Sequence, residues 1–233
     1  MEIYLKGITT ALKGAPTTLS VSLIAVVIGF ALGVGLSLMK SSRHKVLRGI
    51  STTYIEIVRG TPLLVQALIF AYGLPQIFEF SYPRYVLGVP GLIIPAILVC
   101  GLNSAAYMAE VIRGGIDAVP KGQIEAGLAI GMKRRQVMRH IVLPQAFRIV
   151  LPSLGNEFVT LIKETSVLSY VGVVEVLRQA SLWSASSFEY FPAYIGAAVV
   201  YLLMTFPLSK LVRYAERRLS GQTRKQLAKE GKC

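Results

Sequence analysis

The sequence predicts an all-α membrane protein with five transmembrane helices, an outer N-terminus and an inner C-terminus. Composition is the first observation that predicts this fold class. The 233 residues are 53% hydrophobic and 16% charged, whereas ordinary globular chains contain about 25% charged residues. The second observation is that the apolar residues stand in long blocks. A helix of about 20 apolar residues is what crosses the hydrocarbon core of a bilayer.

Five apolar blocks define the predicted spans. Four of them contain no Asp, Glu, Lys or Arg, namely residues 14–39, 60–78, 85–109 and 190–209. A fifth block, 146–168, is apolar except for Arg148, Glu157, Lys163 and Glu164. Within one transmembrane domain of residues 1–233, we therefore expect spans at about 12–39, 52–78, 90–113, 146–168 and 190–213.

The distribution of basic residues predicts the orientation of these spans. Of the 25 Lys and Arg residues, 4 lie in residues 40–49, 7 in 113–148 and 8 in 210–233. A net charge of +13 also occurs in nucleic-acid-binding proteins. Here, however, the basic clusters fall between or after spans on one side of the membrane, as the positive-inside rule describes. We therefore assign these segments to the cytoplasm and expect no nucleic-acid partner.

Two acid–base pairs are expected near the inner ends of the second and third spans. Glu56 and Arg59 are three residues apart, as are Glu110 and Arg113, so each pair shares one face of a helix. Pro62 interrupts the backbone hydrogen bonds of a helix, so Gly-Thr-Pro after Arg59 predicts a bend. Structural pairing and a role in gating or subunit contact both remain open for these residues.

The longest cytoplasmic loop, 114–145, predicts two short helices at the membrane surface. Residues 125–130 favour a helix, Gly131 breaks it, and residues 133–142 resume it. Pro144 is expected to end this second helix before the fourth span begins. The small, acidic-tipped face of Glu125, Ala126 and Ala129 suits docking of another protein, and the alternative is an amphipathic loop resting on anionic lipid.

The spacing within this loop resembles the EAA loop of ABC importer permeases. The matching residues are Glu125, Ala126, Gly127, Gly131, Ile141, Leu143 and Pro144. The family pattern has Ala where this chain has Gly127, and that position requires a small side chain. Further segments resemble permeases for polar and basic amino acids, namely residues 54–62, 106–110, 113–116, 122–123, 144–146 and 163–166. The resemblance covers residues 15–215.

The resemblance implies a non-catalytic translocation subunit with the type I ABC importer permease fold. Such subunits pair as homodimers or heterodimers in the bacterial inner membrane, surrounded by lipid. Their EAA loops contact ATP-binding subunits, and an extracytoplasmic substrate-binding protein delivers the solute. This chain has no Gly-x-x-x-x-Gly-Lys-Ser/Thr motif. ATP and Mg²⁺ are therefore expected on the partner subunit, and this chain is expected to hold no cofactor and no metal.

Polar residues near the centres of the spans are the candidate substrate site, because polar groups at mid-depth are costly and are functional hypotheses by default. Glu157 is the most costly of them, and either a basic partner or a cationic ligand would explain it. We expect it to receive the guanidinium or ammonium of a basic amino acid (arginine, lysine or histidine), with Asn103 bonding the head group. Glutamine or another polar amino acid is the alternative. The complete candidate set is Gln66, Asn103, Asn156, Glu157, Thr160 and Tyr201.

Two other classes of protein fit the sequence less well. A secondary transporter often shows internal repeats, and we find none. A membrane enzyme would require a catalytic constellation. His44 and His140 both lie in basic cytoplasmic segments, where solvation is expected.

Overall fold

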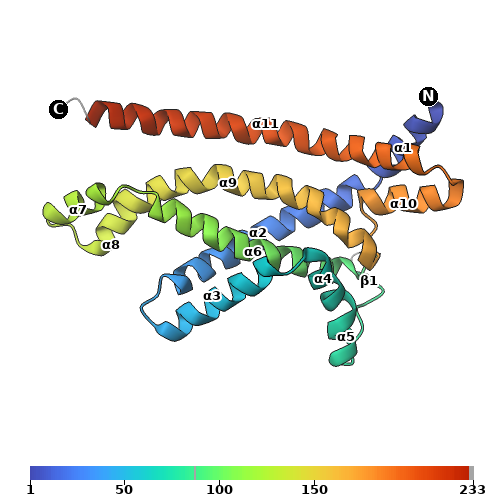
Figure 1. Cartoon of the computed structure of the whole chain (residues 1–233), viewed down its shortest axis with the longest axis horizontal. Helices are drawn as coiled ribbons and strands as arrows, with labels where there is room; N and C mark the ends of the chain where they lie inside the picture. Colours follow the sequence, from blue (N-terminus) through green and yellow to red (C-terminus); the bar gives the residue numbers. More distant parts are fainter. Residues whose placement is uncertain (87, 231–233) are drawn as a thin grey trace.

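The computed structural model describes residues 1–86 and 88–230, so residues 231–233 of the predicted domain lie outside the described part. It is a bundle of long helices lying roughly side by side (Figure 1). The helices are α1 Glu2–Leu12, α2 Ala15–Lys40, α3 Lys45–Gly60, α4 Leu63–Leu68, α5 Leu74–Ile77, α6 Ile93–Asp117, α7 Lys121–Ala129, α8 Arg134–Val137, α9 Leu143–Glu164, α10 Val176–Ser187 and α11 Tyr190–Glu230. Shorter elements are the π-helical turns η1 Ile69–Gly73 and η2 Met138–Val142, the 3₁₀ helix η3 Thr165–Val171, and a hairpin of β1 Tyr85–Val86 and β2 Val89–Pro90.

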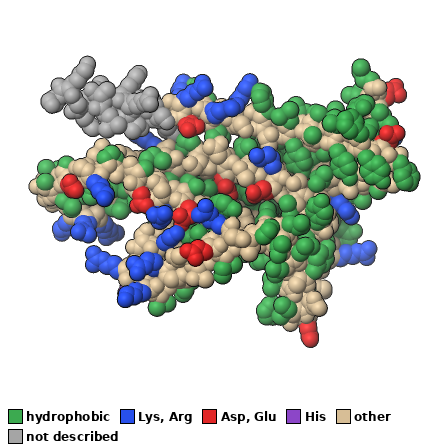
Figure 2. Space-filling model, viewed as in Figure 1, with side chains coloured by type: hydrophobic (Ala, Val, Ile, Leu, Met, Phe, Trp, Pro, Cys, Tyr) green, Lys and Arg blue, Asp and Glu red, His purple; other side chains and the backbone are tan. Residues whose placement is uncertain are grey.

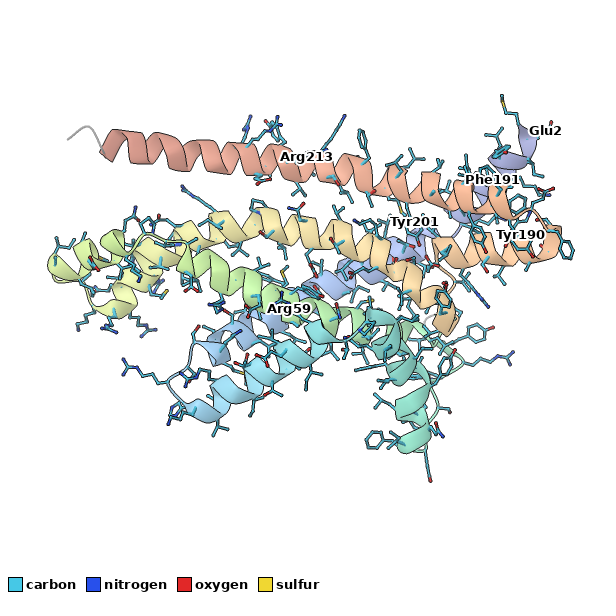
Figure 3. The ribbon with its side chains drawn as sticks, viewed as in Figure 1. Glu2, Arg59, Tyr190, Phe191, Tyr201 and Arg213 are labelled. Carbon is cyan, nitrogen blue, oxygen red and sulfur yellow. The ribbon has the colours of Figure 1, made fainter. Side chains whose placement is uncertain are left out.

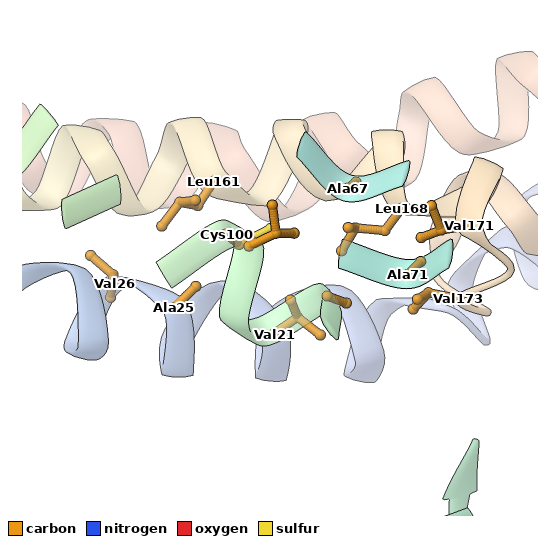
Figure 4. Packing of buried hydrophobic residues seen from close by; sticks show 12 residues of the cluster. Val21, Ala25, Val26, Ala67, Ala71, Cys100, Leu161, Leu168, Val171 and Val173 are labelled. Carbon is orange, nitrogen blue, oxygen red and sulfur yellow. The ribbon is translucent and has the colours of Figure 1, made fainter. Parts of the chain in front are cut away.

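The interior is built where α2, α6 and α9 pack together. Glycines allow the first two helices to approach closely. A Cβ atom on Gly29 would lie 2.6 Å from the Ser104 hydroxyl oxygen, and one on Gly33 would lie 2.6 Å from Cβ of Met108. Close approach through small residues is the usual way in which helices pack in lipid. Figure 4 shows the apolar cluster at this junction, which includes Val21, Cys100 and Leu161.

The first apolar segment begins earlier than predicted. Helices α1 and α2 together form an apolar stretch from Glu2 to Lys40, whereas the predicted span began near residue 12. The first part of this stretch packs against α11 through two glycines. A Cβ atom on Gly7 would lie 2.4 Å from the Pro192 carbonyl oxygen, and one on Gly196 would lie 2.4 Å from the Gly7 carbonyl carbon. The N-terminal helix is therefore tied to the last helix of the chain.

The second predicted span is broken by a sharp bend. Helix α3 ends at Gly60, and the helical segment from Leu63 to Ile77 leaves it at an angle of 104°. The bend confirms the break that Gly-Thr-Pro predicts. The break arises because Thr61 is extended (φ −118°, ψ 142°) and the residue before a proline disfavours the α conformation. Helix α3 also begins at Lys45, inside the stretch that was expected to be a loop.

The described residues contain three helices long and apolar enough to cross a membrane, or up to four if the bent pair counts as one span. The three are Glu2–Lys40, Ile93–Asp117 and Tyr190–Arg218. The block at 146–168 lies in α9 and the start of η3 and does not meet that test. Its four charged residues explain why. The predicted count of five spans is therefore not established by helix length and composition.

The three basic clusters lie at one end of the bundle. The connection between α2 and α3, the hairpin of α7 and α8, and the C-terminal part of α11 all lie toward the left in Figure 1, opposite the N-terminus and α10. Figure 2 shows Lys and Arg side chains gathered toward that end, while hydrophobic side chains dominate the other. This arrangement agrees with the expectation that these segments share the cytoplasmic side.

Candidate functional site

The loop that resembles the EAA segment folds as a helical hairpin. Helix α7 carries Glu125, Ala126 and Ala129 on its exposed surface, and Ile130 directly after it is 80% exposed. Gly131 makes the turn with a φ of +86°, a conformation that costs glycine almost nothing. The α8 side of the hairpin then starts with a capping box, in which the Lys133 amide donates to the Gln136 side chain at 2.8 Å.

The side of the hairpin that faces the protein is closely packed. Gly127 is buried, and a Cβ atom there would lie 2.8 Å from Cδ1 of Ile141. This contact explains why glycine suits the position at which related loops have alanine. The Gln145 side chain donates hydrogen bonds to Gln123 and to the Ile141 carbonyl. The hairpin is therefore fastened to the start of α9 and leaves its opposite face free.

The expectation that Pro144 ends the helix is wrong. Residues 138–142 form the π-helical turn η2, and α9 continues from Leu143 with Pro144 in its first turn. Proline lacks the N–H that an α-helical i→i−4 hydrogen bond needs, and the π-helical turn directly before it accommodates the missing donor. Leu143 lines an apolar groove of about 330 Å³ between α2, α6 and α9. The α8 side of the hairpin thus continues through η2 into α9 without a break in the helix.

Two of the predicted mid-depth residues bind each other. The Asn103 amide on α6 donates to the Gln66 side-chain oxygen on α4 at 3.0 Å. The Gln66 amide in turn donates to the Val58 carbonyl at 2.8 Å and to the Thr61 hydroxyl at 2.8 Å. The bond to Val58, and a further bond from the Gln66 amide to the Thr61 carbonyl at 3.1 Å, satisfy backbone acceptors left free where α3 ends. The pair therefore bridges the 104° bend and joins it to α6.

The part of α9 that carries the predicted polar residues lies next to α6 near Ser104. Glu157 and Thr160 are half-buried and Asn156 is exposed. The Glu157 carboxyl lies beside Ser104, the residue that follows Asn103 on α6. The fold thus joins Asn103 to Gln66 and places Glu157 beside α6 at the residue after Asn103.

Tyr201 belongs to a different part of the protein. Its hydroxyl donates to the Glu175 carboxylate at the start of α10. That carboxylate also accepts hydrogen bonds from the Leu177 and Arg178 amides at 2.9 and 2.7 Å. Burial raises the pKa of the Glu175 carboxyl, against the lowering effect of these hydrogen bonds. In Figure 3, Tyr201 lies on α11, apart from the bend at the end of α3. Tyr201 thus fastens α10 to α11, away from Asn103 and Gln66.

The second predicted acid–base pair is present and is part of a larger network. Arg113 donates to Glu110 at 3.3 Å and to Asp117 at 2.8 Å. Lys40 at the end of α2 also binds Glu110, which was not foreseen. This network joins the inner ends of α2 and α6, as structural pairing would require.

The first predicted pair, Glu56 with Arg59, is absent from the described residues, so that expectation is wrong. The Arg59 guanidinium instead lies 5.4 Å from the centre of the Tyr107 ring on α6, a favourable cation–π contact. Tyr107 lies in segment 106–110, which resembles permeases, but its contact with Arg59 is not predicted from the sequence. The sequence does indicate a shared face of this helix, because Asn103, Tyr107 and Glu110 recur at helical spacing.

Among residues 1–86 and 88–230, no group of three His, Cys, Asp or Glu side chains is placed to hold a metal.

The comparison with protein families identifies the chain. A model of the family described as "binding-protein-dependent transport system inner membrane component" matches residues 17–221. The chain belongs to this family. It is therefore an inner-membrane permease subunit of an ABC importer and is not itself an enzyme. ATP hydrolysis takes place on a separate ATP-binding subunit, and the family implies a second permease subunit as well.

Curated relatives and solved structures agree with this assignment. The chain is 35% identical to the arginine transport system permease protein ArtQ of Bacillus subtilis, over 90% of this chain and 92% of the relative. It is 37% identical to the probable glutamine ABC transporter permease protein GlnM of the same organism, over 94% and 97%. It is 38% identical to the nopaline transport system permease protein NocM of Agrobacterium fabrum, over 93% and 90%.

The structural comparison extends to the whole fold. A chain from the crystal structure of an amino acid ABC transporter with histidines has a TM-score of 0.84 and 38% identity, covering 92% of this chain and 96% of that one. A chain of the MetNI methionine ABC transporter in an inward-facing conformation has a TM-score of 0.69 at 17% identity, which supports the fold alone. The type I ABC importer permease fold is thus established.

Proposed function

We propose that this permease carries amino acids into the cytoplasm, and that basic amino acids (arginine, lysine or histidine) are its preferred substrates. The curated relatives are named for arginine, glutamine and nopaline, which supports amino acids as the class. The observation that carries the basic preference is Glu157, a half-buried carboxylate in a helix that is otherwise mostly apolar. Among the described residues, none of the ion pairs involves Glu157.

An unpaired carboxylate at this depth is costly, and a cationic substrate would relieve that cost during each transport cycle. Asn103 and Gln66 supply amide groups at the neighbouring helices, suited to the polar head group of an amino acid. Asn156 and Thr160 share the helical face of Glu157 and complete the proposed site. Tyr201 has no place in it, because its hydroxyl binds Glu175. Glutamine is the second candidate substrate, and a relative named for glutamine favours it.

Transport is proposed to follow alternating access, in which the permease exchanges between outward-open and inward-open states. The exposed face of Glu125, Ala126 and Ala129 would dock on the ATP-binding subunit. The packing of Gly127 against Ile141 and the continuity of Leu143 and Pro144 with α9 would pass motion from that contact to Glu157. An extracytoplasmic substrate-binding protein would deliver the amino acid at the opposite end, and lipid would cover the exposed apolar faces.

The basic preference is tested by Glu157→Gln in the complete transporter reconstituted in liposomes. We expect arginine uptake to fall about tenfold or more, because the charge-assisted contact is lost, while any glutamine uptake is retained. The matched control is Glu216→Gln on the exposed surface of α11, which should leave uptake of both unchanged. Undiminished arginine uptake by Glu157→Gln would refute the basic assignment and favour glutamine or another polar amino acid.

A further inference from the structure

Arg59 is a cation in an unusual position. It stands at the end of α3, about 21 Å along the helix from Lys45 at 1.5 Å per residue, directly before the 104° bend. The side chain is exposed in the isolated chain. Among the described residues, the ion pairs join Lys40 and Arg113 to Glu110 and Asp117, and none involves Arg59.

The guanidinium is held next to the proposed substrate site. Its contact with the Tyr107 ring fixes it against α6, one helical turn from Asn103. The residue before it, Val58, accepts the hydrogen bond from Gln66, which in turn binds Asn103. Arg59 and the amide pair are therefore anchored to the same helix end and the same face of α6. Figure 3 shows Arg59 at this junction between α3 and α6.

A contact with an aromatic ring does not neutralise a charge. A guanidinium within a transmembrane domain usually meets an anion or water, and its planar fork of donors matches a carboxylate in two parallel hydrogen bonds. Every α-amino acid carries such a carboxylate. Glu157 on α9, which lies beside Ser104 and thus beside the residue that follows Asn103, has the opposite charge. The two residues thus offer complementary charges to the two ends of a basic amino acid.

We propose that Arg59 binds the α-carboxylate of the transported amino acid, while Tyr107 holds the guanidinium in place between transport cycles. This inference rests on the proposed function. It separates two tasks, since Arg59 would recognise the group common to all amino acids, and Glu157 would recognise the side chain. A structural pairing with Glu56 would instead give Arg59 no part in substrate recognition.

The test compares amino acids with their decarboxylated analogues on the purified complex of permease and ATP-binding subunits. The probes are arginine against agmatine, and glutamine against 4-aminobutanamide, each measured by equilibrium binding. In Arg59→Gln, we expect affinity for the amino acid to fall about tenfold or more, with affinity for the analogue unchanged. Arg59→Lys should recover part of the loss, since it keeps the charge but not the fork. The matched control is Arg218→Gln, which removes a guanidinium that lies 5.0 Å from the Tyr214 ring.

The outcomes separate the possible roles of Arg59. An equal loss for amino acid and analogue would overturn the proposal and indicate a gate or a contact with a carboxylate of the second permease subunit. Unchanged amino-acid affinity in Arg59→Gln would also overturn it. If the wild-type complex binds no analogue measurably, the amino acid is compared with its methyl ester instead. Arg59→Gln should then lose the preference for the amino acid over the ester. A retained preference would overturn the proposal. Failure of the wild type to bind either amino acid would instead refute the proposed function, and the inference with it.

Discussion

At the residue scale, single glycines decide the shape of the hairpin formed by α7 and α8. Gly127 leaves the space that Ile141 fills, and Gly131 makes the turn between the two helices. The two positions differ in their physical requirement. A Cβ atom on Gly127 would meet neighbouring side chains, whereas one on Gly131 would meet nothing within 4 Å. Only the backbone conformation, with φ at +86°, therefore demands glycine at position 131.

Gly131→Ala should destabilise the permease through backbone strain alone. A left-handed conformation costs a residue with a Cβ atom about 1–2 kcal/mol, and no steric contact adds to this cost. We expect a lower midpoint of thermal unfolding for the purified complex in detergent. The control is Gly122→Ala in α7, where a Cβ atom also meets nothing within 4 Å but φ is not positive. This change should be neutral or stabilising by up to about 1 kcal/mol. Equal effects of the two changes would contradict the argument from φ.

At the element scale, the N-terminal helix is held by the last helix of the chain rather than by its neighbours in sequence. Gly7 on α1 and Gly196 on α11 bring the two backbones into direct contact. Tyr201 adds a hydrogen bond to Glu175, which caps α10. Helices α1 and α10 therefore pack together with the first part of α11, which further along packs on α9 near Gly155.

Gly196→Ala should loosen this unit. The new Cβ atom would lie 2.4 Å from the Gly7 backbone, and backbone atoms cannot yield as a flexible side chain does. Overpacking of this kind typically costs about 1–3 kcal/mol. We expect faster proteolysis of the α1 segment in detergent and a lower thermal midpoint. The matched control is Gly35→Ala on α2, where a Cβ atom would meet nothing within 4 Å. In this variant, α1 should resist proteolysis as well as it does in the wild type. Wild-type resistance in Gly196→Ala would show that α1 does not depend on this contact.

The elements differ in how far the sequence predicts them. Long apolar blocks predict the helical fold, and Gly131 predicts the turn of the hairpin, because both depend on local composition. Spacing also predicts the pair of Glu110 and Arg113. It fails for Glu56 and Arg59, because Tyr107 from another helix competes for the guanidinium. The prediction that Pro144 ends a helix is wrong because residue propensities do not reveal the π-helical turn that accommodates it. Contacts between distant segments, such as Asn103 with Gln66, require the fold.

At the scale of the whole molecule, the basic end and the hairpin determine where a partner can act. The hairpin projects from the end of the bundle where the basic clusters lie (Figure 1), and Glu125 is exposed on it as an acid among many Lys and Arg residues. Its inner face is fixed to α9 through Gln145. Under the proposed function, this attachment would pass motion of the hairpin to α9 and Glu157.

Glu125→Lys should disrupt that coupling without unfolding the chain. The side chain is exposed, and among the described residues none of its atoms takes part in a side-chain hydrogen bond or ion pair, so the fold loses nothing. A reversed charge at a protein interface typically costs enough to weaken binding about tenfold or more. We expect less ATP-binding subunit to co-purify and lower ATPase activity in the reconstituted complex. Glu216→Lys makes the same change of charge on the exposed surface of α11 and should retain both. If the two variants lost ATPase activity equally, net charge at this end of the molecule would be responsible, and the hairpin would not be the specific docking element.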